Sequence, residues 1–279
     1  MTNRLRVLIS ADLEGISGVV HPTETNPGSY DYERGRALMT AEVNAAVAGV
    51  LDAEPDAEIS VADSHGPFRN LLPEELDRRV RLIRGKPRPL GMVAGLEAGV
   101  DALLFVGYHA RSGAGPAVLA HTISDAVLDV RLDGRSVGEI GLNAAVAGHY
   151  GVPVLLLSGD DAACAELREL VPAAVTVEVK QALGQAAART LHPQEARDRI
   201  RQGAAEAIRT RRQVSPLPTP TPVRVELDLY GPYSVDLATL VPGVTRAAGA
   251  RTLVFTGEDM AEAYRVVQLL VQLAQIKPG

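Results

Sequence analysis

The sequence has little of several features that mark particular protein classes. It contains one cysteine, Cys164, which excludes an intramolecular disulfide and favours a reducing compartment. It has no tryptophan and only 4% aromatic residues, which disfavours a surface that stacks the bases of single-stranded nucleic acid. Its net charge of -6 is opposite in sign to that of a typical nucleic-acid-binding protein. We therefore expect no nucleic-acid partner.

Long hydrophobic runs are also absent. No segment reaches the roughly 18 uninterrupted apolar residues of a membrane-spanning helix, and the apolar run near the N-terminus, Val7–Ala11, is too short for the core of a signal peptide. These absences predict a cytoplasmic protein without a membrane partner. The 46% hydrophobic residues of the 279-residue chain still suffice for a large core, built mainly from Ala, Val and Leu.

Short apolar runs alternate with helix-like segments through most of the chain. This order predicts an α/β fold, with a mostly parallel sheet covered by helices on both faces. The predicted strands are Val7–Ala11, Ile59–Ala62, Leu103–Val106 and Val154–Ser158, and the helix-like segments include Arg36–Leu51, 92–98 and one that begins near Asp160.

A hairpin interrupts this pattern. Residues 127–132 alternate between apolar and polar side chains, Asp133-Gly134 has the composition of a two-residue turn, and Ser136-Val137 would form the returning strand. We interpret this hairpin as a small antiparallel excursion from the parallel sheet.

Residues 215–222 read SPLPTPTP and mark the main boundary along the chain. Proline at every second position prevents a helix or a central strand and favours an extended connector. We therefore expect a catalytic α/β domain at residues 1–214 and a smaller α+β unit at residues 223–279. In the smaller unit, 223–229 alternates as a half-exposed antiparallel strand does, and a strand at 252–256 and a helix at 259–275 follow.

Acidic and histidine side chains follow three of the predicted strands. Asp12 and Glu14 lie after the first strand, His65 after the second and His109 after the third. In an open parallel sheet, the carboxyl ends of the strands border a common crevice where ligands bind. One histidine after a strand is ordinarily a hydrogen-bonded structural residue, but three strands that end in this way predict a metal site. Neutral imidazole and carboxylate are the usual zinc ligands.

Two metal ions need a bridging carboxylate and more ligands than these four side chains provide, and the spacing does not identify the missing carboxylate. His121 follows a glycine-rich segment and suits a loop over the site. There it could act as a general base, a general acid or a nucleophile, although an exposed loop residue is the simpler interpretation. His21, His149 and His192 are interpreted as structural or surface residues.

Motifs of several other enzyme classes are missing. The sequence has no G-x-S-x-G nucleophile motif, no G-x-x-x-x-G-K-[ST] phosphate loop and no H-E-x-x-H helix. A metallopeptidase with this sequence must therefore have another architecture.

Six segments together resemble the DppA-type D-aminopeptidase family of zinc metallopeptidases. Their order along the chain makes the resemblance more specific than any one motif, and it weakens after the proline-rich segment. The segments are SADLEGISG from Ser10, YERGRALMT from Tyr32, ADSH from Ala62, GYHAR from Gly107, GEIGLNA from Gly138 and VPVLLLSGDD from Val152.

The resemblance implies a catalytic site with two zinc ions. Asp12 would bridge the two ions. Glu14 and His109 would complete the coordination of one ion, and His65 and Glu139 that of the other. The resemblance is the only indication for Glu139, which is the carboxylate that spacing leaves unidentified.

The resemblance also implies that His121 is the catalytic histidine. The implied activity is the release of N-terminal residues from short peptides, including peptides of D-amino acids. The implied assembly is a ring-shaped homodecamer whose active sites face an inner chamber. Two alternatives stay open, namely another binuclear metal-dependent amidohydrolase and a non-catalytic intracellular peptide-binding protein.

Overall fold

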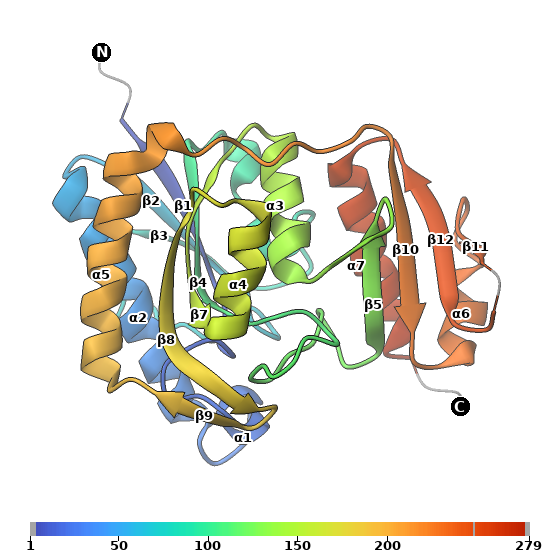
Figure 1. Ribbon diagram of the computed structural model, residues 1–279, viewed down its shortest axis with the longest axis horizontal. Helices are drawn as coiled ribbons and strands as arrows, with labels where there is room; N and C mark the ends of the chain where they lie inside the picture. Colours follow the sequence, from blue (N-terminus) through green and yellow to red (C-terminus); the bar gives the residue numbers. More distant parts are fainter. Residues whose placement is uncertain (1–3, 248, 277–279) are drawn as a thin grey trace.

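Seven strands form one sheet in the order β3-β2-β1-β4-β7-β8-β9 in the computed structural model, which describes residues 4–247 and 249–276 (Figure 1). Neighbouring strands are parallel except β9, which is antiparallel to β8. The predicted α/β fold with a mostly parallel sheet is therefore confirmed. The bounds are β1 Arg6–Ala11, β2 Glu58–Asp63, β3 Arg81–Ile83, β4 Ala102–Tyr108, β7 Val154–Asp160, β8 Val175–Gly184 and β9 Ala187–Thr190.

The order of the strands reverses at β1. The chain passes from β1 to β2 on one side, and β4 later pairs with the other side of β1. Strands β4 and β7 are buried along their whole length because they are continuous apolar runs in the middle of the sheet. In open parallel sheets, ligands commonly bind where the strand order reverses, at the carboxyl ends of the two central strands, which here are β1 and β4.

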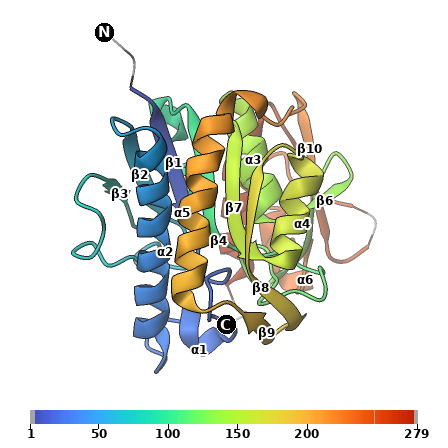
Figure 2. The same ribbon diagram turned by 60° about the vertical axis from the view of Figure 1, so that its left-hand side comes forward.

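Helices cover both faces of the sheet. The long helices α2 (Tyr32–Ala53) and α5 (Pro193–Thr210) pack side by side over one face (Figure 2). Helix α4 (Asp161–Leu170) packs against β7, β8 and α3 (Glu139–His149) on the other face. Two short elements accompany these helices, namely helix α1 (Pro22–Thr25) and the 3-10 turn Arg211–Gln213 that follows α5.

The segment 92–98, expected to be a short helix, instead forms two 3-10 turns, Gly91–Val93 and Leu96–Ala98. Gly95 lies between them with a φ of 115°. This left-handed backbone conformation cannot continue a right-handed helix, so the two turns are separate.

A second, antiparallel sheet has the order β11-β12-β10-β5-β6 and lies beside the first (Figure 1). The hairpin predicted around Asp133-Gly134 is confirmed as β5 and β6, and both turn residues have positive φ. The predicted alternation of residues 223–229 is also confirmed, since apolar side chains of β10 are buried. The bounds are β5 Val127–Leu132, β6 Arg135–Val137, β10 Val223–Leu229, β11 Thr245–Arg246 and β12 Thr252–Gly257.

The second sheet takes strands from both sides of the proline-rich segment, because β5 and β6 precede residues 215–222 and β10 follows them. Helices α6 (Pro232–Ala238) and α7 (Met260–Ala274) pack on this sheet, and α7 also packs against α3. The division into units 1–214 and 223–279 remains a proposal, and its outer ends, residues 1–3 and 277–279, lie outside the described residues. Among the helices that the structure describes, none combines the length and apolarity needed to cross a membrane.

We expect Gly49→Ala to lower the free energy of unfolding by about 1–3 kcal/mol. Helices α2 and α5 approach so closely at Gly49 that an added Cβ would lie 2.2 Å from the carbonyl oxygen of Arg201, so the helices would have to separate. Urea denaturation measures the change. Gly184→Ala is the matched control, because its Cβ would meet nothing within 4 Å. Equal stability of the two variants would contradict this packing.

Candidate metal centre

The residues that follow β1, β2 and β4 meet at the carboxyl edge of the sheet. Ala11, the last residue of β1, pairs with Asp63 of β2 on one side and with Val106 of β4 on the other. The loops that leave these strands therefore begin side by side. They carry Asp12 and Glu14, His65, and His109 respectively.

Two glycines allow the loop after β1 to lie against the end of β4. The amide of Gly15 donates to the carbonyl of Gly107 at 2.8 Å. A Cβ at Gly15 would lie 2.0 Å from the carbonyl oxygen of Tyr108, and Gly107 has a φ of 72°. The close approach leaves no room for a side chain at Gly15, and the backbone conformation favours glycine at position 107.

The imidazoles and carboxylates of the cluster alternate in space. His65 Nδ1 lies 2.9 Å from Glu14 Oε2 and 3.3 Å from Asp12 Oδ1. His109 Nε2 lies 3.5 Å from Asp12 Oδ2 and 3.4 Å from Glu139 Oε1. All five side chains are buried. The two oxygens of Asp12 thus face different histidines.

Backbone carbonyls fix the tautomers of both buried histidines. His65 Nε2 lies 2.9 Å from the carbonyl of Thr25, and His109 Nδ1 lies 3.0 Å from the carbonyl of Ala110. A carbonyl only accepts hydrogen bonds, so these ring nitrogens carry the proton. The opposite nitrogens face the carboxylates and would bind a metal ion once they give up their protons to it.

His121 lies beside the cluster on the irregular segment between β4 and β5. Its ring stacks on that of His109 with centroids 4.1 Å apart, and its Nε2 lies 3.9 Å from Glu139 Oε1. The side chain of His121 is 22% exposed, compared with 2% for that of His109. Its Nδ1 lies 2.8 Å from the carbonyl of Leu119, which can only accept, so the neutral ring has its lone pair on Nε2.

Burial and mutual repulsion control the charges of the carboxylates. Burial, and then the charge of Glu14, raise the pKa of Asp12 to about 8. Burial also raises the pKa of Glu14, but the charge and hydrogen bond of His65 outweigh it and lower the pKa well below its usual value. Burial lowers the pKa of His109, but the charge of Glu139 and the other carboxylates outweighs it and raises the pKa well above its usual value.

The donor set fits a divalent cation. One ligand atom each from Asp12, Glu14 and His109 lies within 4.8 Å of the others, and the same holds for His109, His121 and Glu139. Carboxylate oxygens and imidazole nitrogens are the donors that zinc prefers. A cation among these atoms would also compensate the buried negative charge.

A buried hydrogen-bond network lies behind the cluster. Ser10 Oγ is 2.7 Å from Tyr108 Oη and 2.9 Å from Ser64 Oγ, and Asn143 Nδ2 donates to Tyr108 Oη at 3.0 Å. Tyr264 of α7 donates to Asn143 Oδ1 at 2.8 Å. The network therefore connects the ends of β1, β2 and β4 to α3 and α7. Sequence reasoning missed it, because single polar residues within apolar runs have no diagnostic spacing.

Two buried charged residues hold the loop that carries Glu14, and sequence reasoning missed both. The ammonium group of Lys180 donates to the carbonyls of Glu14, Ile16 and Val19. Glu42 Oε1 accepts from the amide of Ser17 at 2.8 Å. The loop is therefore fixed by its backbone, which leaves the carboxylate of Glu14 free for the cluster.

The fold and this donor set define a protein of the metallohydrolase class. The chain belongs to the D-aminopeptidase family, which residues 5–269 match. The resemblance inferred from the six sequence segments is therefore confirmed.

A known protein sequence and a solved structure each match nearly the whole chain. A D-aminopeptidase of Bacillus subtilis (strain 168) is 37% identical over 270 residues, which are 97% of this chain and 98% of that protein. The solved structure of the Zn-dependent D-aminopeptidase DppA from Bacillus subtilis, described as a self-compartmentalizing protease, matches with a TM-score of 0.95 and 36% identity. The match covers 99% of this chain and 100% of that chain.

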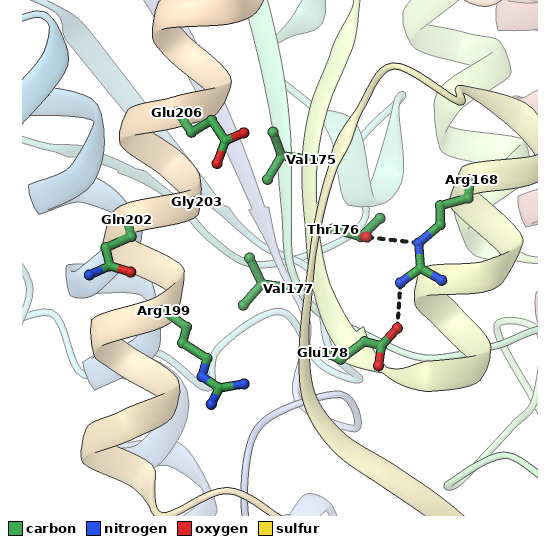
Figure 3. A pocket seen from close by; sticks show the side chains of 9 residues that line it. All are labelled: Arg168, Val175, Thr176, Val177, Glu178, Arg199, Gln202, Gly203 and Glu206. Atoms are coloured by element: carbon green, nitrogen blue, oxygen red, sulfur yellow. Dashed lines mark hydrogen bonds and ion pairs between the residues drawn. The ribbon is translucent and has the colours of Figure 1, made fainter.

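A surface groove of about 340 Å³ lies between α5 and β8 and contains none of the six predicted site residues (Figure 3). Arg168 forms a hydrogen bond to Thr176 and an ion pair with Glu178 there, and Arg199 pairs with Glu195. Since both arginines are already paired with protein groups, we assign no function to this groove.

Glu42 is expected to make the folding stability depend on pH. Burial raises its pKa from 4.5 to about 7, although the Ser17 amide and Lys180 lower it. The folded state therefore binds the proton more tightly than the unfolded state, and this contribution to stability declines as the pH rises from about 5 to about 7.

The variant Glu42→Gln removes this titration. The free energy of unfolding of the variant minus that of the wild type should therefore be about 2 kcal/mol larger at pH 7 than at pH 5. Urea denaturation of both proteins at pH 5, 6 and 7 measures the difference, from which the titration of all other groups cancels. A difference that stays constant over this range would contradict the raised pKa.

Proposed function

We propose that this protein is a zinc-dependent aminopeptidase that hydrolyses short peptides, including peptides of D-amino acids. The observation that carries the proposal is the buried cluster of three carboxylates and two histidines at the carboxyl edge of the sheet. Membership of the D-aminopeptidase family supports the reaction. The relative from Bacillus subtilis, a Zn-dependent D-aminopeptidase that this chain matches over nearly its whole length, supports the metal and the substrate.

We further propose that each chain binds two zinc ions. Asp12 would bridge the ions, and the orientation of its two oxygens toward different histidines supports this role. Glu14 and His109 would complete one site, in agreement with the short distances among the ligand atoms of Asp12, Glu14 and His109. His65 and Glu139 would complete the other.

Zinc ions held by these residues would polarise the scissile carbonyl and lower the pKa of a bound water. His121 is the proposed catalytic residue, because its Nε2 keeps a lone pair and its side chain is partly exposed to an incoming peptide. Both a general base and a nucleophile need such a lone pair. The backbone amide of Ile123 donates to Glu139 at 2.6 Å, which ties the loop of His121 to the metal site.

The proposal extends to a cytoplasmic homo-oligomer, namely a ring-shaped decamer. The relative with the same fold is described as a self-compartmentalizing protease, which supports assembly around a chamber. The single cysteine, which is buried, agrees with a reducing compartment. Active sites that face an inner chamber would admit short or unfolded peptides and exclude folded proteins.

The first test combines metal analysis of the purified protein with an assay on D-Ala-D-Ala and L-Ala-L-Ala. We expect about two zinc ions per chain, as for a bridged two-metal site, and cleavage that a chelator abolishes. The ratio of the two rates gives the chirality preference.

Asp12→Ala should lose at least one zinc ion and its activity, because the carboxylate contacts both histidines.

The other outcomes point to the alternatives. Zinc without cleavage of either peptide would favour another amidohydrolase or a peptide-binding protein. A chain that takes up no zinc after reconstitution would contradict the metal site and the function together. An Asp12→Ala variant with full zinc content and full activity would contradict only the bridging role of Asp12.

We expect His121→Ala to keep its zinc and to lose at least about 100-fold in kcat, the usual minimum for loss of acid–base catalysis. His121 contacts the cluster from its edge, so its removal should leave the five ligands in place. His149→Ala is the control, because His149 ends α3 and lies near Asp259 instead. Undiminished activity of His121→Ala would remove this residue from the mechanism.

A further inference from the structure

Helix α4 carries a partly buried carboxylate whose two oxygens accept hydrogen bonds from two different loops. Glu166 Oε2 accepts from the backbone amide of Arg111 at 2.9 Å, and Glu166 Oε1 accepts from the backbone amide of Gly138 at 3.3 Å. Among the described residues, no backbone hydrogen bond directly joins the loop of Arg111 to that of Gly138.

The two loops adjoin two of the five metal-ligand candidates. Arg111 follows His109 by two residues, and Gly138 immediately precedes Glu139. The side chains of His109 and Glu139 come within 3.4 Å of each other. The distance between the side chains of His109 and Glu139 therefore depends on how Glu166 holds the two loops together.

The loops are also in close contact at this point. A Cβ on Gly138 would lie 2.5 Å from Arg111 Cβ and 3.1 Å from Glu166 Oε1. Gly138 has a φ of -101°, which other residues adopt without strain. The glycine is therefore required by the contact between the loops and not by its backbone conformation.

We propose that Glu166 is a positioning residue for the metal centre, because it joins the loops of His109 and Glu139 and fixes the distance between these two ligands. The inference rests on the proposed zinc site. It assigns no contact between Glu166 and the metal or the substrate. Groups that orient metal ligands from behind ordinarily change metal affinity when they are altered.

The variant Glu166→Gln tests the role, because glutamine keeps the size of the side chain but has only one acceptor oxygen. One of the two loops must then lose its hydrogen bond and face an amide group that donates. We expect the free zinc concentration at half-occupancy to rise about tenfold, measured by competition with a chromophoric chelator. Melting of the metal-free proteins is measured in parallel.

Glu169→Gln is the matched control on the same helix. It makes the same change of charge at an exposed side chain, whose carboxylate is 3.9 Å from Arg135. This variant should bind zinc as the wild type does. Gly138→Ala separates the two loops while leaving the carboxylate intact, so it should also weaken zinc binding.

Three results would overturn the inference in distinguishable ways. Wild-type zinc affinity in both Glu166→Gln and Gly138→Ala would remove the positioning role while leaving the proposed function intact. A lower melting temperature of metal-free Glu166→Gln with unchanged zinc affinity would show a purely structural role. A wild-type protein that binds no zinc would refute the proposed function and this inference together.

Discussion

The burial of three carboxylates beside two histidines is the constraint on which the rest of the structure depends. Carboxylates so close together cannot all be charged at low energetic cost, and the raised pKa of Asp12 expresses that conflict. Backbone amides relieve part of it, since Leu13 donates to Asp12 and Ile123 donates to Glu139. A cation among the carboxylates would relieve more. The cluster is thus poorly suited to a solely structural role and well suited to hold metal.

Such a cluster needs a rigid frame, and the frame comes from elements far apart in the sequence. Parallel pairing of β1 with both β2 and β4 brings three ligand loops to one edge of the sheet. Beyond the strands, the loops are fixed by side chains that bind their backbone: Lys180 holds the loop of Glu14, and Glu166 joins the loops of His109 and Glu139. Because these contacts involve backbone groups, the ligand side chains remain free to bind a metal ion.

The sequence was sufficient to predict four strands of the parallel sheet, β1, β2, β4 and β7, and the convergence of Asp12, His65 and His109, because both follow from local apolar runs and the geometry of parallel sheets. It did not predict β3, β8 or β9, which lie toward the two edges of that sheet. Glu139 has no such pattern, since it begins a helix after a hairpin, and only the family resemblance pointed to it. Lys180 was hidden for another reason. Regular alternation would place Lys180 on the same exposed face as Glu178, but the pairing of β8 with β7 shifts between these two residues, so Lys180 turns inward. A local bulge of this kind depends on tertiary pairing.

The second sheet is part of the site through its hairpin. His121 lies on the segment that enters β5, and Glu139 follows directly after β6. Both residues are therefore anchored by the hairpin of β5 and β6. Strand β5 of this hairpin pairs with β10, which follows the proline-rich segment in the sequence. Tyr264 of α7 reaches the same region through Asn143 and Tyr108. The ligands after β1, β2 and β4 depend on the parallel sheet, whereas the proposed catalytic histidine and Glu139 depend on both sheets. Relative movement of the sheets would therefore displace His121 and Glu139 before it displaced Asp12, Glu14 or His65.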